Sequence, residues 1–192
     1  MRILLSMFVF LLVTACESNS QKVIVIQPFG DFPKTESEIT LKQIKKVNPN
    51  TVMRENIPFP AASYYKPRNR YKASILLEFL KKRIGKDTVI IGLSRLDLST
   101  KKGAIEDWGV MGLGYRPGNA CVVSSFRLSK SNKREQFYKV ALHELGHTQG
   151  LPHCPKKNCL MRDAEGGNPL DQEKEFCPDC KKYLQEKNWI LL

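Results

Sequence analysis

The stretch that decides the fold is His-Glu-Leu-Gly-His-Thr-Gln-Gly-Leu-Pro-His-Cys, residues 143–154. On an α-helix, residues four apart lie on one face, so His143 and His147 can both point at one ion. Imidazole nitrogen is a good zinc ligand, and Glu144 beside them is a carboxylate that can take a proton from zinc-bound water. This spacing predicts a helix that carries a metal site.

A third histidine follows a predicted turn. Gly150 comes three residues after His147, where a residue without Cβ can end the helix in a left-handed turn and reverse the chain. That turn would bring His153 back as a third ligand, and three protein nitrogens plus one water form the open coordination of catalytic zinc. All three histidines of the chain lie in this stretch, which argues against incidental surface histidines. We therefore predict a catalytic zinc site with a general base: His143, His147, His153 and Glu144.

The residues before this stretch predict how its helix is anchored. Asn132 with Glu135 resembles a helix start. An apolar row then runs along the helix: Phe137, Ala141 and Leu145. His143 lies about 200° around the helix axis from Ala141, so the metal-binding face is turned away from that row. The helix can thus be held by one side and do chemistry with the other.

Two cysteine pairs follow, Cys154-x4-Cys159 and Cys177-Pro-Asp-Cys180. Pairs of this kind can supply four thiolates to a closed tetrahedral zinc site. An exported protein can instead form two disulfides under oxidising conditions. The second pair could also be a thiol-redox motif, but no thioredoxin-like unit precedes it. Spacing alone favours structural zinc and leaves disulfides open, while Cys121 is most simply a buried strand thiol.

The N-terminus resembles a secretory signal. Arg2 precedes an apolar run over residues 3–13, which is too short for a comfortable membrane span. The sequence Val-Thr-Ala-Cys over 13–16 also resembles the bacterial lipobox, in which Cys16 is lipidated and becomes the mature N-terminus; a plain signal peptide or a buried first helix is the alternative. We expect a signal peptide over 1–15, a lipid-anchored tether over 16–21, and an exported lipoprotein held at a membrane of a bacterial cell envelope.

The 192 residues, 42% of them hydrophobic, suit one ordinary domain with a sizeable core. The formal charge is +12, and Lys and Arg are scattered rather than grouped in a long basic block. Such an excess bears on solubility and encounter, and it most simply forms a solvated basic surface. Because the chain is expected to be exported, we exclude nucleic acid as a partner. We expect a monomer.

The remaining pattern predicts an α/β fold. Thr35 and Glu38 look like a capping box at the start of a helix that ends before Asn48-Pro49. An amphipathic pattern predicts a second helix over 71–84, and residues 58–70 read as a loop. Three apolar, β-branched stretches predict strands: 22–29, 51–57 and 88–93. This alternation implies a sheet with parallel pairs and helices packed on it.

Two further strands are predicted at 108–115 and 120–126, with turn residues between them. Three glycines in the first strand weaken its side-chain packing: Gly109, Gly112 and Gly114. One reason to tolerate them is close approach of another backbone, such as a substrate peptide that pairs with this strand. A twisted or bulged strand with no ligand explains them equally well.

Together these motifs resemble the archaemetzincin family of zinc metallopeptidases. The resemblance rests on His-Glu-x-x-His-x-x-Gly-x-x-His-Cys-x4-Cys-x-Met from residue 143, followed by Cys-x-x-Cys at 177–180. It implies a metzincin-like twisted mixed sheet with backing helices, an active-site helix and a small zinc-bearing C-terminal subdomain, which divides 22–192 into 22–150 and 151–192. It also implies a second zinc ion on four cysteines: Cys154, Cys159, Cys177 and Cys180. Met161 matches the family methionine beneath the catalytic metal, although an ordinary core methionine would look the same.

The expected function is peptide-bond hydrolysis by a zinc-bound water, with Glu144 as general base and a peptide or protein as substrate. The alternative is a lipid-anchored zinc-binding or adaptor protein with a vestigial catalytic site. Glu144 argues against that alternative, since a pure binding site has no use for a carboxylate beside the ligands. A basic interaction module built on the four cysteines is a third possibility, which the signal sequence disfavours.

Overall fold

The computed structural model describes residues 21–191. The predicted signal peptide and Cys16 lie outside the described residues. The central sheet has five strands in the order β2-β1-β5-β9-β8, where β8 pairs antiparallel with β9 and the other neighbours pair in parallel. Its strands are β1 (Val23–Pro28), β2 (Thr51–Met53), β5 (Thr88–Ser94), β8 (Gly112–Gly114) and β9 (Ala120–Ser124).

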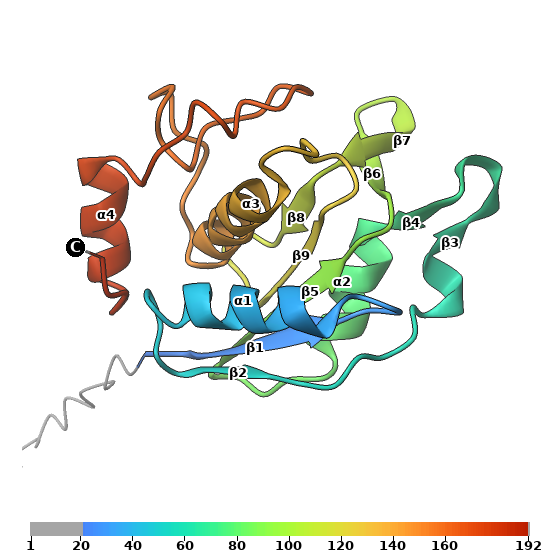
Figure 1. The fold of residues 1–192 in the computed structure, drawn as a ribbon, viewed down its shortest axis with the longest axis horizontal. Helices are drawn as coiled ribbons and strands as arrows, with labels where there is room; N and C mark the ends of the chain where they lie inside the picture. Colours follow the sequence, from blue (N-terminus) through green and yellow to red (C-terminus); the bar gives the residue numbers. More distant parts are fainter. Residues whose placement is uncertain (1–20, 192) are drawn as a thin grey trace, which may run out of the picture.

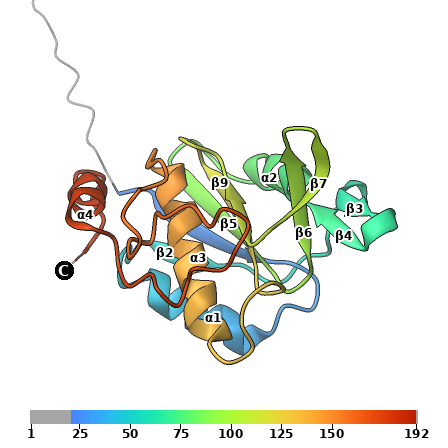
Figure 2. The same cartoon turned by 90° about the horizontal axis from the view of Figure 1, so that it is seen from above.

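Helices cover both faces of this sheet (Figure 2). On one face lie α1 (Lys34–Ile44) and α3 (Lys133–Thr148), and on the other lies α2 (Ala73–Lys81). In β1, Ile24 and Ile26 join the core beneath α1 and α3, while Val25 between them joins the core beneath α2. Strands buried on both faces read as continuous apolar runs, which explains why β1 and β5 were predictable from sequence.

Two helix starts differ from the predictions. The capping box is wrong, because Thr35 lies inside α1, whose N-cap is Pro33, and no side chain caps the helix. α2 begins at Ala73 rather than Tyr71, because Tyr71 is held in strand pairing with Leu98. The second predicted strand is also shorter, ending at Met53, with an isolated bridge from Phe29 to Ile57 beyond it.

A second, four-stranded sheet in the order β3-β4-β6-β7 was not predicted. It lies at the right-hand end in Figure 1, and its strands are β3 (Tyr64–Tyr65), β4 (Arg70–Lys72), β6 (Leu98–Lys102) and β7 (Ile105–Val110). Two short 3₁₀ turns, Ala61–Ser63 and Lys66–Arg68, flank β3, so the predicted loop over 58–70 is partly wrong. The predicted strand over 108–115 is divided at Met111, since β7 belongs to this sheet and β8 to the central one.

Charged side chains hold the strands of the second sheet together and join the sheet to the residues after β9. Asp97 is 7% exposed and accepts hydrogen bonds from Arg70 Nε at 2.6 Å and Arg127 Nε at 2.8 Å. Arg70 also donates to Asp107 Oδ2 at 2.8 Å. Such partly buried, hydrogen-bonded pairs join residues that are far apart in sequence. Because these contacts between distant residues help to hold the sheet, its strands do not need a continuous run of apolar residues.

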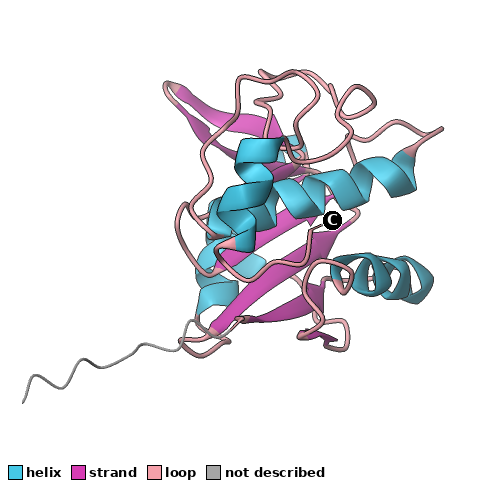
Figure 3. Ribbon diagram, turned by 90° about the vertical axis from the view of Figure 1, so that its left-hand side faces the viewer, coloured by secondary structure: helices cyan, strands magenta, loops and turns pink. Residues whose placement is uncertain are grey.

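The chain after α3 is mostly irregular until α4 (Pro178–Gln185), as Figure 3 shows from the α4 side. Isolated bridges join Cys154 to Arg162 and Cys159 to Glu175. The residues after α3, including α4 and the end of the chain, contribute to the core beneath α1 and α3: Leu151, Met161, Leu170, Phe176, Leu184 and Trp189. The division into subdomains at residue 150 and the monomeric state stay predictions. Within residues 21–191, no helix is both long and apolar enough to span a bilayer.

Candidate metal centre

The end of α3 reverses the chain as its glycine predicted. Gly150 has a φ of 106°, in the left-handed region that favours glycine. Its N–H donates to His147 O at 2.9 Å, and the Leu151 N–H donates to Gly146 O at 3.2 Å. These two bonds form a Schellman motif. The residues after Gly150 are thereby directed back toward the helix they have just left.

The three histidines come together at this reversal. One ligand atom from each of His143, His147 and His153 lies within 4.8 Å of the others. Each ring also has a polar partner at Nδ1: Leu160 O at 2.6 Å from His143, Leu151 O at 2.7 Å from His147, and Asp163 Oδ2 at 3.3 Å from His153. These partners leave the Nε2 atoms for a shared ion, and such contacts orient histidines that bind zinc.

Burial keeps the helical histidines neutral, which is the form that binds metal. It lowers the pKa of His143 to about 3, with a smaller contribution from His147 nearby. Burial also lowers the pKa of His147. Asp163 has a lowered pKa, chiefly because the Glu165 N–H donates to it at 2.9 Å. A carboxylate therefore remains available to hold His153.

Glu144 lies in a narrow slot between α3 and the edge strand β8. Its side chain is almost fully buried, and burial raises its pKa to about 8. A Cβ added at Gly112 would lie 2.5 Å from Glu144 Oε1, and one at Gly114 would lie 3.0 Å from Glu144 O. Gly109 likewise makes room for the guanidinium group of Arg127. The glycines are thus explained by close side chains and helix backbone, while approach of a substrate backbone stays a prediction.

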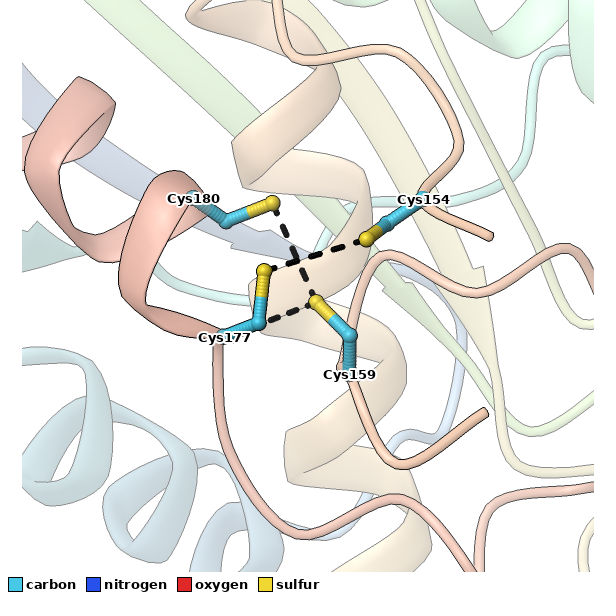
Figure 4. Close-up of side chains that lie close together, drawn as sticks. All are labelled: Cys154, Cys159, Cys177 and Cys180. Atoms are coloured by element: carbon cyan, nitrogen blue, oxygen red, sulfur yellow. Dashed lines mark hydrogen bonds between the residues drawn. The ribbon is translucent and has the colours of Figure 1, made fainter. Parts of the chain in front are cut away.

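The four C-terminal cysteines form a second group, with their sulfurs directed toward one another (Figure 4). The Sγ atoms of Cys154 and Cys177 are 3.8 Å apart, as are those of Cys159 and Cys180. A disulfide requires about 2.05 Å. Four sulfurs at about 2.3 Å from a tetrahedral zinc ion would lie about 3.8 Å from one another. The geometry fits four thiolates on one zinc ion and not two disulfides.

The histidine group and the cysteine group are held in place by the same segment of the chain. Cys154 directly follows His153, and its N–H donates to Met161 O at 2.7 Å. Leu160, which accepts from His143, lies between Cys159 and Met161. Residues 151–161 therefore contribute to both sites at once.

Several known proteins are similar to this chain in sequence and in fold. An archaemetzincin from Haloquadratum walsbyi is 28% identical over 178 residues, covering 84% of this chain and 99% of that protein. One from Methanopyrus kandleri is 33% identical over 138 residues, covering 70% and 77%. The sequence model of Peptidase family M54 matches residues 21–186. The chain belongs to peptidase family M54. The crystal structure of a Methanopyrus kandleri archaemetzincin superposes on this M54 chain with a TM-score of 0.73 and 26% identity, covering 91% of this chain and 98% of that one.

The resemblance to archaemetzincins is therefore confirmed, as is the mixed α/β fold with a four-cysteine cluster near the C-terminus. M54 is a family of zinc metallopeptidases, and both groups in this member fit zinc. Met161 is fully buried, and its Sδ would lie 2.7 Å from a Cβ at Gly146. The methionine thus packs against α3 between His143 and His147, and its role beneath the metal stays a prediction.

Sequence reasoning missed Asp163 in this M54 site. Asp163 follows the predicted methionine by two residues, but no spacing rule links it to His153. The only local signal was an acidic residue on the segment that returns past the histidines. Its contact with His153 depends on the bridge between Cys154 and Arg162, which brings the two segments together.

Replacing Gly112 with alanine should misplace Glu144 and reduce peptide turnover. The new Cβ would overlap the carboxylate, and a displacement of about 1 Å in a catalytic group can cost on the order of 100-fold in rate. Gly85→Ala is the matched control, since no atom lies within 4 Å of a Cβ there. Steady-state kcat and the thermal midpoint would be measured for both. A Gly112→Ala protein with the turnover of Gly85→Ala would show that the slot does not position Glu144.

Proposed function

We propose that this M54 protein is a zinc-dependent peptidase that hydrolyses peptide bonds with a water activated at the histidine site. The observation that carries the proposal is the convergence of His143, His147 and His153, with Glu144 buried beside them. Zinc bound there would supply Lewis-acid chemistry, lowering the pKa of water and polarising a carbonyl group. The cysteine group would hold a second, structural zinc ion.

The residues of the chain would bind the ion, orient its ligands and transfer the proton. The Nε2 atoms of the three histidines would hold the ion, while Leu160, Leu151 and Asp163 fix the rings from the Nδ1 side. A carboxylate oxygen of Glu144 takes a proton from the attacking water and then gives it to the leaving nitrogen. The slot against Gly112 keeps that oxygen in place and largely out of bulk water.

The edge strand β8 offers the substrate a place to bind. β8 ends the central sheet at this side, and Gly112–Gly114 line the same cavity as the three histidines. An extended peptide can add to an exposed sheet edge through main-chain hydrogen bonds. Binding there would bring a peptide bond to Glu144.

A peptide library tests this function against the adaptor alternative. Zinc-loaded protein covering residues 21–192 would be incubated with a mixed library, and new termini would be identified by mass spectrometry. We expect cleavage that stops when a chelator removes zinc. If folded, zinc-loaded protein cleaves no peptide, the peptidase proposal fails and a zinc-binding role is left.

We also propose that Cys16 is lipidated and anchors an exported protein to a membrane of the cell envelope. The support is the sequence of residues 1–16 alone. Labelled palmitate should enter the full-length protein in bacterial cells and be lost in Cys16→Ser. Equal labelling of both proteins would contradict the anchor.

A further inference from the structure

A cavity of about 860 Å³ contains the histidine triad and reaches along α3 as far as Val140, near the middle of the helix. One wall is α3 itself, with Val140 and His143. Another part of the wall is the irregular segment between Met161 and α4, with Leu170 and Glu173. A side chain of a bound peptide could enter this space next to the cleaved bond.

Glu173 is the unusual member of this wall. It is only 2% exposed, and among residues 21–191 its Oε2 atom has no hydrogen-bond partner. Burial raises its pKa to about 7. A buried polar group without a partner is costly, and native proteins rarely leave one. The structural contacts of the described residues therefore do not account for this carboxyl group.

The basic side chains near Glu173 form hydrogen bonds and ion pairs with other residues. Lys139 Nζ donates to Leu170 O at 2.8 Å and pairs with Glu135 Oε1 at 2.7 Å. Arg162 Nη1 donates to Gln172 Oε1 at 2.8 Å. Both lower the pKa of Glu173 through their charge, yet neither donates a hydrogen bond to it.

Arg127, another basic residue of the wall, is also neutralised. Arg127 is held by Asp97 through bonds of 2.8 Å and 2.9 Å. Three more basic residues line the cavity: Lys101, Lys102 and Arg116. None of the basic residues among 21–191 donates a hydrogen bond to Glu173 Oε2, so that atom can accept one from a bound ligand.

We propose that Glu173 determines substrate specificity by binding a positively charged group of the peptide, either a lysine or arginine side chain next to the cleaved bond or the free α-amino group. The proposal rests on the peptidase function. A guanidinium or ammonium group entering the cavity would give Glu173 the donors it lacks, and a guanidinium can do so with two parallel bonds. Desolvated pairs of this kind discriminate strongly, because removing one partner leaves the other buried and unpaired.

The test compares peptides that differ only in one charged group. Arginine and its neutral isostere citrulline would be placed in turn at each residue flanking the cleaved bond, in N-acetylated and free-amino versions. Wild-type kcat/KM should favour the cationic peptide by about 30-fold or more. Preference for arginine in acetylated peptides identifies a side-chain site, while preference for the free amine over the acetylated form identifies an α-amino site.

The variant Glu173→Gln should reduce that preference to a few fold while leaving the neutral peptide unaffected. Glu175→Gln is the matched control, because Glu175 is exposed and pairs with Lys181 outside the cavity. Fluorescence anisotropy in a Glu144→Gln background would measure the same preference as a ratio of Kd values, without turnover. Circular dichroism and thermal midpoints would show that each variant is folded.

Two results would overturn the role of Glu173. One is wild-type protein that cleaves cationic and neutral peptides equally well, which is decisive even if Glu173→Gln does not fold. The other is a cationic preference that survives in folded Glu173→Gln. Failure of the peptidase function would look different, since no peptide of either charge would be cleaved.

Discussion

Replacing Glu144 with glutamine is expected to lower kcat for peptide hydrolysis by about 10³- to 10⁴-fold while the protein keeps its zinc. The amide has nearly the shape of the carboxylate, so it fits the slot against Gly112, but it cannot accept the proton of the attacking water. Burial in the metal-free site raises the pKa of Glu144, so the neutral amide should not destabilise the fold. The positive charge of bound zinc would favour the carboxylate form that acts as the base. Initial rates, zinc content and thermal midpoints would be measured together.

The control for this variant is Glu135→Gln, on the same helix. Glu135 is exposed and pairs with Lys139 four residues on, an interaction worth only a few tenths of a kcal/mol. Its turnover should stay within about twofold of wild type, since it lies far from the histidines along α3. Glu144→Gln protein that retained a tenth or more of wild-type kcat would remove Glu144 from the proton-transfer role.

The double variant Cys177→Ser/Cys180→Ser should lose the second zinc ion and also weaken the first. Structural zinc supplies folding free energy directly, so we expect a fall of more than about 10 °C in the thermal midpoint. The second effect follows from the shared segment 151–161. The Cys154 N–H donates a hydrogen bond to Met161 O, and Cys154 directly follows His153. Leu160, which follows Cys159, accepts a hydrogen bond from the His143 ring.

We therefore expect zinc to bind the histidine site about 10- to 100-fold more weakly in the double variant, which is the usual cost of losing outer support of a metal ligand. Disturbance of His153 should come first, because Cys154 is its covalent neighbour. Competition with a chromophoric chelator would give the affinity. Cys121→Ala is the control, since Cys121 is a buried thiol in β9 outside the cysteine group. Wild-type zinc affinity at the histidine site of the double variant would show that the two sites are independent.

The parts of the site that sequence predicted are those with local spacing. His143 and His147 are one helical turn apart, Gly150 ends the helix, and each cysteine pair spans a short loop, so chain geometry alone brings these residues near one another. The apolar runs of β1 and β5 predicted the centre of the sheet for the same reason. Each of these patterns is complete within a few residues.

The parts that sequence missed depend on contacts between distant segments. Asp163 reaches His153 only after the irregular segment folds back, and Glu173 enters the cavity only once that segment lies beside α3. The glycines of β8 suggested a close neighbour, but its identity as Glu144 required the docking of α3 on the sheet edge. β6 has the sequence Leu-Ser-Thr-Lys-Lys, and its polar residues hid a strand that the Asp97 ion pairs help to hold.

The zinc-dependent mechanism is tested most directly by a zinc titration of metal-free protein, in which native mass spectrometry and peptide cleavage are measured on the same samples. We expect two zinc ions per chain at saturation, four reduced thiols in the cysteine group, and cleavage that rises as the histidine site fills. Glu144→Gln should bind the same two ions with no cleavage. A wild-type chain that holds both ions and cleaves no peptide, or cleavage that does not follow zinc occupancy, would contradict this mechanism.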